Sequence, residues 1–158
     1  MKRILCISFI LIAFISSARC QELFPVKVGM KWGYIDKAAK MVVAPQFDET
    51  EVFSEGLAPF RVSNKWGFVD PSGKIIINPV YQDVHGFSEG LAAVKLDGKW
   101  GFTDLKGTLA ITPQFNMVSA FAEGLCAVKL ANAWAYIDPA GKILINPQFS
   151  DAMKFSDG

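Results

Sequence analysis

Acidic side chains that recur at a fixed interval are the first residues in this chain that could carry out a reaction. One aspartate lies 34 residues from the next in four segments: Asp36, Asp70, Asp104 and Asp138. A second acid follows each of them: Glu55, Glu89, Glu123 and Asp157. Two carboxylates can act as acid and base in glycoside cleavage, but such an enzyme needs one asymmetric site. Because these acids recur in four equivalent places, and Asp near Pro or Gly is a common turn device, the sequence favours turn and capping roles.

A basic residue recurs with the same 34-residue step and offers a candidate binding surface. These residues, here called the cationic ladder, are Lys27, Arg61, Lys95 and Lys129. Stacked repeats would align them, and we expect them on the face opposite the core residues. Such a ladder would attract an anionic glycan, a lipid headgroup or an acidic protein. The alternative is a solvated face whose charges discourage aggregation at sheet edges.

Aromatic residues also fall into columns, and this distribution favours core packing. Sixteen of the twenty aromatic residues occupy four repeating positions. One of these columns contains every tryptophan: Trp32, Trp66, Trp100 and Trp134. Large aromatic side chains dominate burial and pack against one another. The alternative is that rings from adjacent hairpins form cages for a sugar or a quaternary ammonium group.

The sequence contains few residues suited to nucleophilic catalysis or metal binding. His85 is the only histidine, and Cys126 shares a column with alanines, so neither a nucleophile–base pair nor a zinc cluster is indicated. The dense Asp spacing of calcium loops is missing. We therefore predict no catalytic residue, no metal site and no cofactor, and we expect the protein not to be an enzyme.

The columns define four repeats of 34 residues without insertion or deletion: 23–56, 57–90, 91–124 and 125–158. Each repeat contains several Gly and Pro residues and only short apolar runs, which favours strands over helices. We expect three strands in each repeat: the first as at residues 91–96 of the third repeat, and the second and third as at residues 66–69 and 74–77 of the second repeat. Pro79 is expected to end the third strand, and the connector that follows has room for one helical turn. The sequence thus predicts an all-β fold of antiparallel units stacked as a solenoid. An incomplete propeller-like array is the alternative.

The repeated phrase resembles a known family. Lys-Trp-Gly, an aromatic, an aliphatic and Asp are followed, after two intervening residues, by Gly-Lys, and then by Pro-Gln-Phe and Phe-Ser-Glu-Gly-Leu-Ala. This pattern is similar to the bacterial WG, or KWG, repeat. The resemblance covers residues 23–158. Ala39 replaces the turn glycine of the sister repeats, and Ala133-Trp134-Ala135 replaces Lys-Trp-Gly. The resemblance implies an exported or envelope-associated β-repeat protein.

The N-terminus has the pattern of an export signal. A basic start at Lys2 and Arg3 precedes an apolar run over residues 4–15 and then small or polar residues, so we expect residues 1–20 to be a cleaved signal peptide. Lipidation at Cys20 is the less favoured alternative. Signal removal would leave thirteen basic and fifteen acidic residues, a net charge of about −2 that disfavours a nucleic-acid partner. No membrane span is expected in the remaining chain.

These features together predict an exported, non-catalytic repeat module that mediates protein or glycan binding, or scaffolding, at the cell envelope. The alternative is an accessory repeat domain of a larger enzyme, truncated at residue 158. Self-association through open repeat ends is a further expectation, because a repeat array without a polar cap exposes apolar surface.

Overall fold

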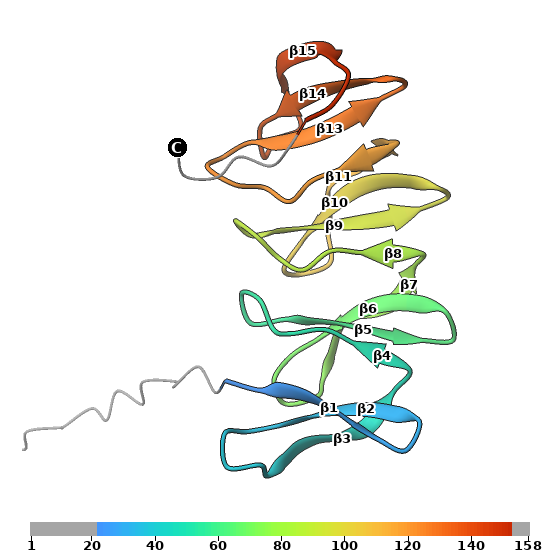
Figure 1. Cartoon of the computed structure of the whole chain (residues 1–158), viewed down its shortest axis with the longest axis vertical. Coiled ribbons are helices and arrows are strands. Elements are labelled where there is room, and N and C mark those ends of the chain that lie inside the picture. Colours follow the sequence, from blue (N-terminus) through green and yellow to red (C-terminus); the bar gives the residue numbers. More distant parts are fainter. Residues whose placement is uncertain (1–21, 153–158) are drawn as a thin grey trace, which may run out of the picture.

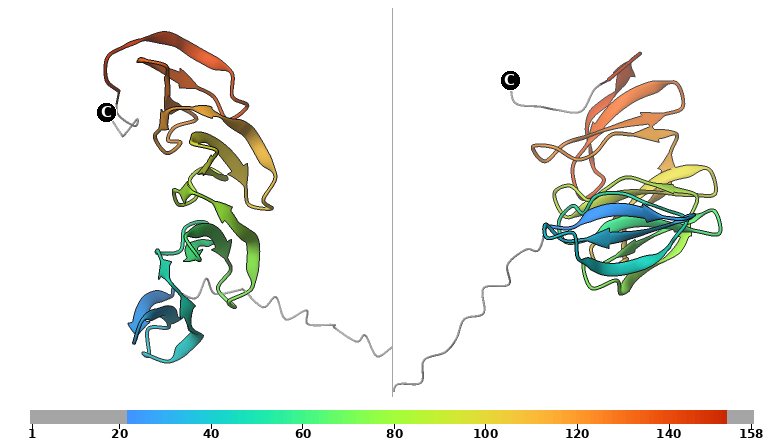
Figure 2. Two further views of the ribbon diagram at one scale, coloured as in Figure 1. Left: turned by 90° about the vertical axis from the view of Figure 1, so that its right-hand side faces the viewer. Right: turned by 60° about the horizontal axis from the view of Figure 1, so that its bottom comes forward.

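The computed structural model describes residues 22–152, which form four antiparallel sheets stacked along one axis (Figure 1). The expected signal peptide, Cys20 and Asp157 lie outside the described residues. The described part is all-β, and its sheets follow one another along the stack and form no closed barrel (Figure 2). The predicted solenoid-like repeat array is therefore confirmed.

Every sheet is built around the same three strands, a pattern that fits the short apolar runs of each repeat. The first sheet contains β1 (Phe24–Val28), β2 (Lys31–Ile35) and β3 (Met41–Phe47). The second contains β4 (Glu49–Thr50), β5 (Ala58–Val62), β6 (Lys65–Val69) and β7 (Ile75–Tyr81). The third contains β8 (Asp83–Val84), β9 (Leu91–Leu96), β10 (Lys99–Asp104) and β11 (Leu109–Phe115). The fourth contains β12 (Met117–Val118), β13 (Cys126–Leu130), β14 (Ala133–Ile137) and β15 (Ile143–Phe149).

The third strand of each repeat is longer than the sequence predicts. We expected Pro79 to end it, but β7 continues through this proline to Tyr81. Proline is tolerated because β7 lies at a sheet edge and bulges: Phe68 pairs with Ile77, whereas Trp66, only two residues earlier, pairs with Tyr81. The bulged backbone crosses close to Gly67, where an added Cβ would lie 2.4 Å from the carbonyl oxygen of Ile77. In the first three repeats the glycine of the Trp-Gly pair therefore leaves room for the bulged strand.

The connector between repeats forms a short strand, so the expectation of a helical turn there is wrong. Glu49 and Thr50 of the first repeat pair with Arg61 and Phe60 of the second. β8 and β12 repeat this arrangement in the next two sheets. Each of these sheets therefore contains one strand supplied by the preceding repeat, and only the first sheet has three strands.

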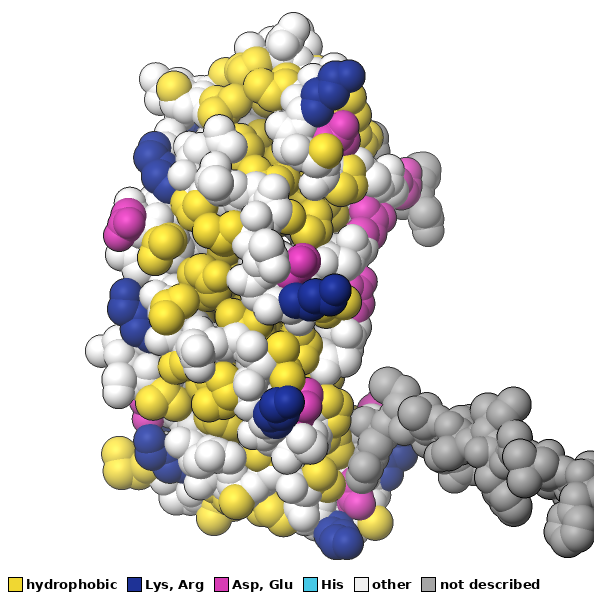
Figure 3. Space-filling view, turned by 180° about the vertical axis from the view of Figure 1, so that it is seen from behind, with side chains coloured by type: hydrophobic (Ala, Val, Ile, Leu, Met, Phe, Trp, Pro, Cys, Tyr) yellow, Lys and Arg dark blue, Asp and Glu magenta, His cyan; other side chains and the backbone are white. Residues whose placement is uncertain are grey.

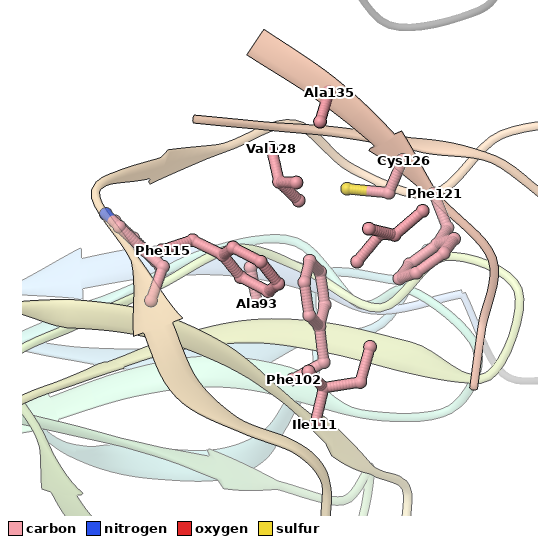
Figure 4. Close-up of a cluster of buried hydrophobic side chains, with 10 residues drawn as sticks. Ala93, Phe102, Ile111, Phe115, Phe121, Cys126, Val128 and Ala135 are labelled. Atoms are coloured by element: carbon pink, nitrogen blue, oxygen red, sulfur yellow. The ribbon is translucent and has the colours of Figure 1, made fainter. Parts of the chain in front are cut away.

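The core lies between successive sheets, because each internal sheet buries both of its faces. One face, here called the aromatic face, carries Phe68 in the second sheet, and it packs against Ala92 and Val94 of the third. The face that bears these small residues is here called the aliphatic face. Figure 4 shows the next interface, where Phe102 and Phe115 face Cys126 and Val128 of the fourth sheet.

Aromatic pairs hold the connectors against the aromatic faces of the first three sheets. The Phe68 and Phe87 rings meet edge to face with centroids 4.9 Å apart, and Phe102 and Phe121 repeat this geometry at 4.9 Å. All four side chains are buried. Such pairs contribute about 0.5–1.5 kcal/mol each beyond the burial of their area. Most residues of the repeating aromatic columns therefore lie in the core, as the sequence favoured, whereas Phe149 at the end of the stack is 39% exposed.

Candidate functional site

The cationic ladder lies directly across the hairpins from the tryptophan column. Lys27 pairs with Trp32, and the other three pairs have the same register. Each cationic group stands over its tryptophan ring, at distances from the centroid that are nearly constant: 5.8 Å for Lys27, 5.7 Å for Arg61, 5.6 Å for Lys95 and 5.8 Å for Lys129. Cation–π pairs at exposed positions contribute about 0.5–1 kcal/mol. The ladder is therefore a repeated element of four cation–tryptophan pairs.

The expected orientation of the ladder is wrong. We placed its cations on the face opposite the core residues, but directly paired residues of antiparallel strands point to the same face. Lys95 therefore shares its face with Trp100, and Ala93 of the same strand pairs with the buried Phe102. Both faces of β9 are buried at its centre, so the cations reach the surface at the margin of a packed face.

The short connector strands place acidic residues beside part of the ladder. Glu49 lies opposite Arg61 and forms an ion pair with it, and Asp83 lies opposite Lys95. Met117 takes the corresponding place beside Lys129, and the first sheet has no such strand beside Lys27. Positive charge is therefore least compensated at the two ends of the ladder. Sequence reasoning missed this because it did not predict the connector strands.

The cage alternative finds no support in this arrangement. Tyr34, Phe68 and Phe102, the rings two residues beyond the first three tryptophans, are buried between sheets. A cation of the chain itself already stands over each tryptophan ring. A quaternary ammonium group would have to displace that cation, whereas an anion could bind to it.

The repeating aspartates are turn residues, as the sequence favoured. Asp70 accepts hydrogen bonds at Oδ1 from the backbone N–H groups of Ser72 at 2.9 Å and Lys74 at 3.0 Å. The same two backbone positions donate to Asp36, Asp104 and Asp138. Each carboxylate thus organises a four-residue turn. Ala39 adopts a φ of 58° where its sister Gly73 has 87°, so the first turn keeps its shape without glycine.

The repeating glutamates have a role that the sequence analysis did not specify. Glu55 accepts a hydrogen bond at Oε2 from the N–H of Gly90 at 2.8 Å, and Glu89 accepts one from Gly124 at 3.0 Å. Each glutamate therefore ties its own turn to the turn one repeat later. The Glu-Gly pair that recurs at residues 55–56, 89–90 and 123–124 was the available clue. The acids of each repeat are engaged in separate turns, and no group of three or more His, Cys, Asp or Glu side chains within residues 22–152 could hold a metal ion.

We expect acid to destabilise the turn that Asp70 organises. Burial raises the pKa of Asp70, but hydrogen bonds from the Ser72 hydroxyl and from the N–H groups of Lys74 and Ser72 outweigh this, so the pKa is lowered. An unfolded aspartate titrates at about 3.9. The stabilisation is therefore present above that pH and is lost as pH falls through the lower folded value. We expect the melting temperature to fall on acidification below about pH 4.

The Asp70→Asn variant tests this assignment. It should melt below the wild type at pH 7, and the difference should shrink as both proteins are acidified, when measured by circular dichroism across a pH series. Asp97→Asn is the matched control, because Asp97 is an exposed hairpin residue with a φ of 50°, which Asn tolerates. A constant difference between Asp70→Asn and wild type at every pH would contradict the role of the charge.

Two further reactive groups lie in packed positions. Burial raises the pKa of the Cys126 thiol to about 11, although hydrogen bonding with Ser119 opposes the shift. The His85 ring packs against Trp100 with centroids 4.7 Å apart, and burial lowers its pKa. The Cys126 thiol therefore lacks the lowered pKa of a reactive nucleophile, and the His85 ring is packed against an aromatic side chain.

A column of exposed aliphatic residues was also missed from the sequence. The third core strand of each sheet begins with an exposed aliphatic residue: Met41, Ile75, Leu109 and Ile143. Hydrophobic side chains are exposed along the length of the stack, with Lys and Arg near their margins (Figure 3). Aliphatic residues in the same column of all four repeats could have identified them, but their exposure depends on the edge position of the strand.

Comparison with known proteins identifies the repeat. The family model described as WG containing repeat matches four consecutive segments: residues 32–66, 66–100, 100–134 and 134–158. No curated protein and no solved structure matches the chain significantly. None of the described residues forms a helix that could cross a membrane. Four tandem matches over residues 32–158, with one sheet for each 34-residue period, show that this chain belongs to the WG repeat family.

Proposed function

We propose that the chain is an exported, non-catalytic module that binds an acidic protein or an acidic glycan at the cell envelope. The observation that carries this proposal is the row of four cation–tryptophan pairs with one geometry along a linear stack. A periodic row of like charges fits an extended anionic partner better than a compact substrate, because each repeat can make the same contact.

The use of the acidic residues supports a non-catalytic role. Asp104 and its sister aspartates are occupied by turn N–H groups, and Glu55 and Glu89 are occupied by glycine N–H groups of the next repeat. Glycoside cleavage needs two carboxylates in one asymmetric site, whereas these acids lie in separate, equivalent turns. The basic start and apolar run over residues 1–20 support export.

A pull-down with a matched control tests the binding surface. The full chain, recovered from the exported fraction of a bacterial host, is immobilised and exposed to envelope extract and to a panel of acidic and neutral glycans. In the test variant, glutamine replaces the four cations of the ladder. In the control variant, glutamine replaces one exposed lysine of each repeat away from the ladder: Lys40, Lys74, Lys106 and Lys142.

We expect the ladder variant to lose retention of the acidic partner and the control variant to keep it. Each charge contributes more at low ionic strength, so retention by the wild type should fall as salt rises from about 0.05 to 0.5 M. Equal retention by both variants would discard the ladder as the binding surface. Retention of neutral glycans alone would contradict the proposed acidic partner.

A further inference from the structure

We propose that the two ends of the stack bind each other, so that a second copy of this chain docks head to tail and extends the array. This proposal adds a scaffolding role and does not depend on an acidic partner binding to the ladder. The three internal interfaces show what covers each type of face: the aromatic face of one sheet always packs on the aliphatic face of the next. One face of each type remains at the ends of the described stack.

The C-terminal end presents an aromatic face with no sheet packed on it among residues 22–152. Phe149 is 39% exposed, whereas its sister residues Phe47, Tyr81 and Phe115 are 2%, 5% and 2% exposed. Ile145 is half-buried, whereas its sister residues Val43, Ile77 and Ile111 are buried. On the three internal aromatic faces the sisters of Phe149 and Ile145 are covered by the aliphatic face of the next sheet, so a sheet with an aliphatic face is the fitting occupant.

The N-terminal end presents the complementary aliphatic face. Val26 is half-buried, whereas its sister residues Phe60, Val94 and Val128 are fully buried against the preceding sheet. Phe24 is 41% exposed in a column that elsewhere holds buried small residues. The second sheet has Ala58 and Phe60 at these two positions, so the first sheet offers an aromatic and an aliphatic residue in the reverse order. Both positions of this end face are therefore apolar, as they are in the other sheets.

Strand pairing and charge give the docking a defined register. Within residues 22–152 the first sheet has no connector strand, whereas each of the other three sheets has one. Asp151 and Ala152 correspond in the repeat to Glu49 and Thr50. The Asp151 side chain accepts a hydrogen bond from the N–H of Ala152 at 2.9 Å. The Asp83 side chain accepts the corresponding bond from the N–H of Val84 at 3.0 Å, at the start of β8.

The pairing of β4 with β5 therefore predicts the pairing between two copies. Asp151 of one copy would lie opposite Lys27 of the next, as Glu49 lies opposite Arg61, and Ala152 would lie opposite Val26. Lys27 is the ladder cation without a neighbouring connector strand, so the docked aspartate would complete the pattern of acid beside cation. The contact joins unlike faces, so it would produce open linear chains and not closed dimers.

Two single substitutions block one end each. Phe149→Glu places a charge on the aromatic end face, and Val26→Glu places one on the aliphatic end face. Burying an unpaired charge in an interface should raise the dissociation constant by at least roughly 30-fold. Melting curves check that both variants fold. The charge reversal Asp151→Lys provides a third variant at an exposed position, for use if either glutamate variant is unfolded.

Sedimentation velocity over a concentration series, on the full chain, decides the proposal. We expect the wild type to form species that grow with concentration, and each variant alone to stay monomeric. An equimolar mixture of Phe149→Glu and Val26→Glu should form a species of two chains and nothing larger, because one intact face of each type remains. Recovery of only this two-chain species is specific to a head-to-tail contact.

Three other results would overturn the proposal. A wild type that stays monomeric at its highest soluble concentration excludes the contact. Dimers of Val26→Glu alone would show that like faces pair. Association that is unchanged in every variant would show that another part of the chain, such as residues 1–21, mediates it.

Discussion

Replacing Gly101 with alanine should destabilise the protein by about 3 kcal/mol, because no space exists for a Cβ atom there. The added atom would lie 2.5 Å from the carbonyl oxygen of Ile111 and 2.6 Å from the nitrogen of Pro113. Both neighbours are backbone atoms of β11, which cannot move far because the same strand contributes Ile111 and Phe115 to the core beneath the fourth sheet. Thermal unfolding followed by circular dichroism measures the loss.

The fourth sheet supplies a matched control for Gly101→Ala. Ala135 occupies the equivalent position, and its strand has the same bulged register with β15. Several residues of β15 are exposed, so this strand can adjust to the methyl group. Ala135→Gly should therefore change stability by less than about 1 kcal/mol. Equal effects of the two substitutions would contradict the steric explanation of the Trp-Gly pair.

Replacing Phe115 with alanine should cost about 3–5 kcal/mol, because the ring is buried between the third and fourth sheets. The same change at Phe149, its sister residue, should cost only about 1–2 kcal/mol, because that ring keeps much of its contact with water. Urea unfolding of the two variants under one set of conditions measures the difference.

The Phe115 and Phe149 comparison must be made at a low protein concentration, where chains do not associate. At a higher concentration the head-to-tail contact would bury Phe149, and the cost of its removal should rise. Equal losses for the two variants in dilute solution would contradict the asymmetry between the internal and end faces.

Local chemistry made the repeating hairpin predictable. The alternation around Trp66 and the turn residues from Asp70 to Gly73 specify a strand, a turn and a strand, and the structure contains these elements in every sheet. The role of Asp70 was predictable because a side chain that binds the N–H groups two and four residues later acts within its own turn.

Longer-range features could not be predicted from the same residues. Pro79 reads as the end of a strand unless the bulge opposite Gly67 is known, and this bulge depends on pairing across the sheet. Glu49 and Thr50 have no apolar alternation that indicates a strand, since they pair with the next repeat. The face of the cationic ladder was misassigned because both faces of an internal sheet are buried, so burial does not identify the face.

The connector strands also bear on how such a gene can change in length. Because every internal sheet combines residues from two successive repeats in one constant phase, removal or duplication of any 34 consecutive residues within the array restores a complete sheet at the junction. No particular cut point is required. Unequal recombination between the repeated coding segments can therefore shorten or lengthen the stack in whole steps, while each new junction inherits pairing partners that already fit.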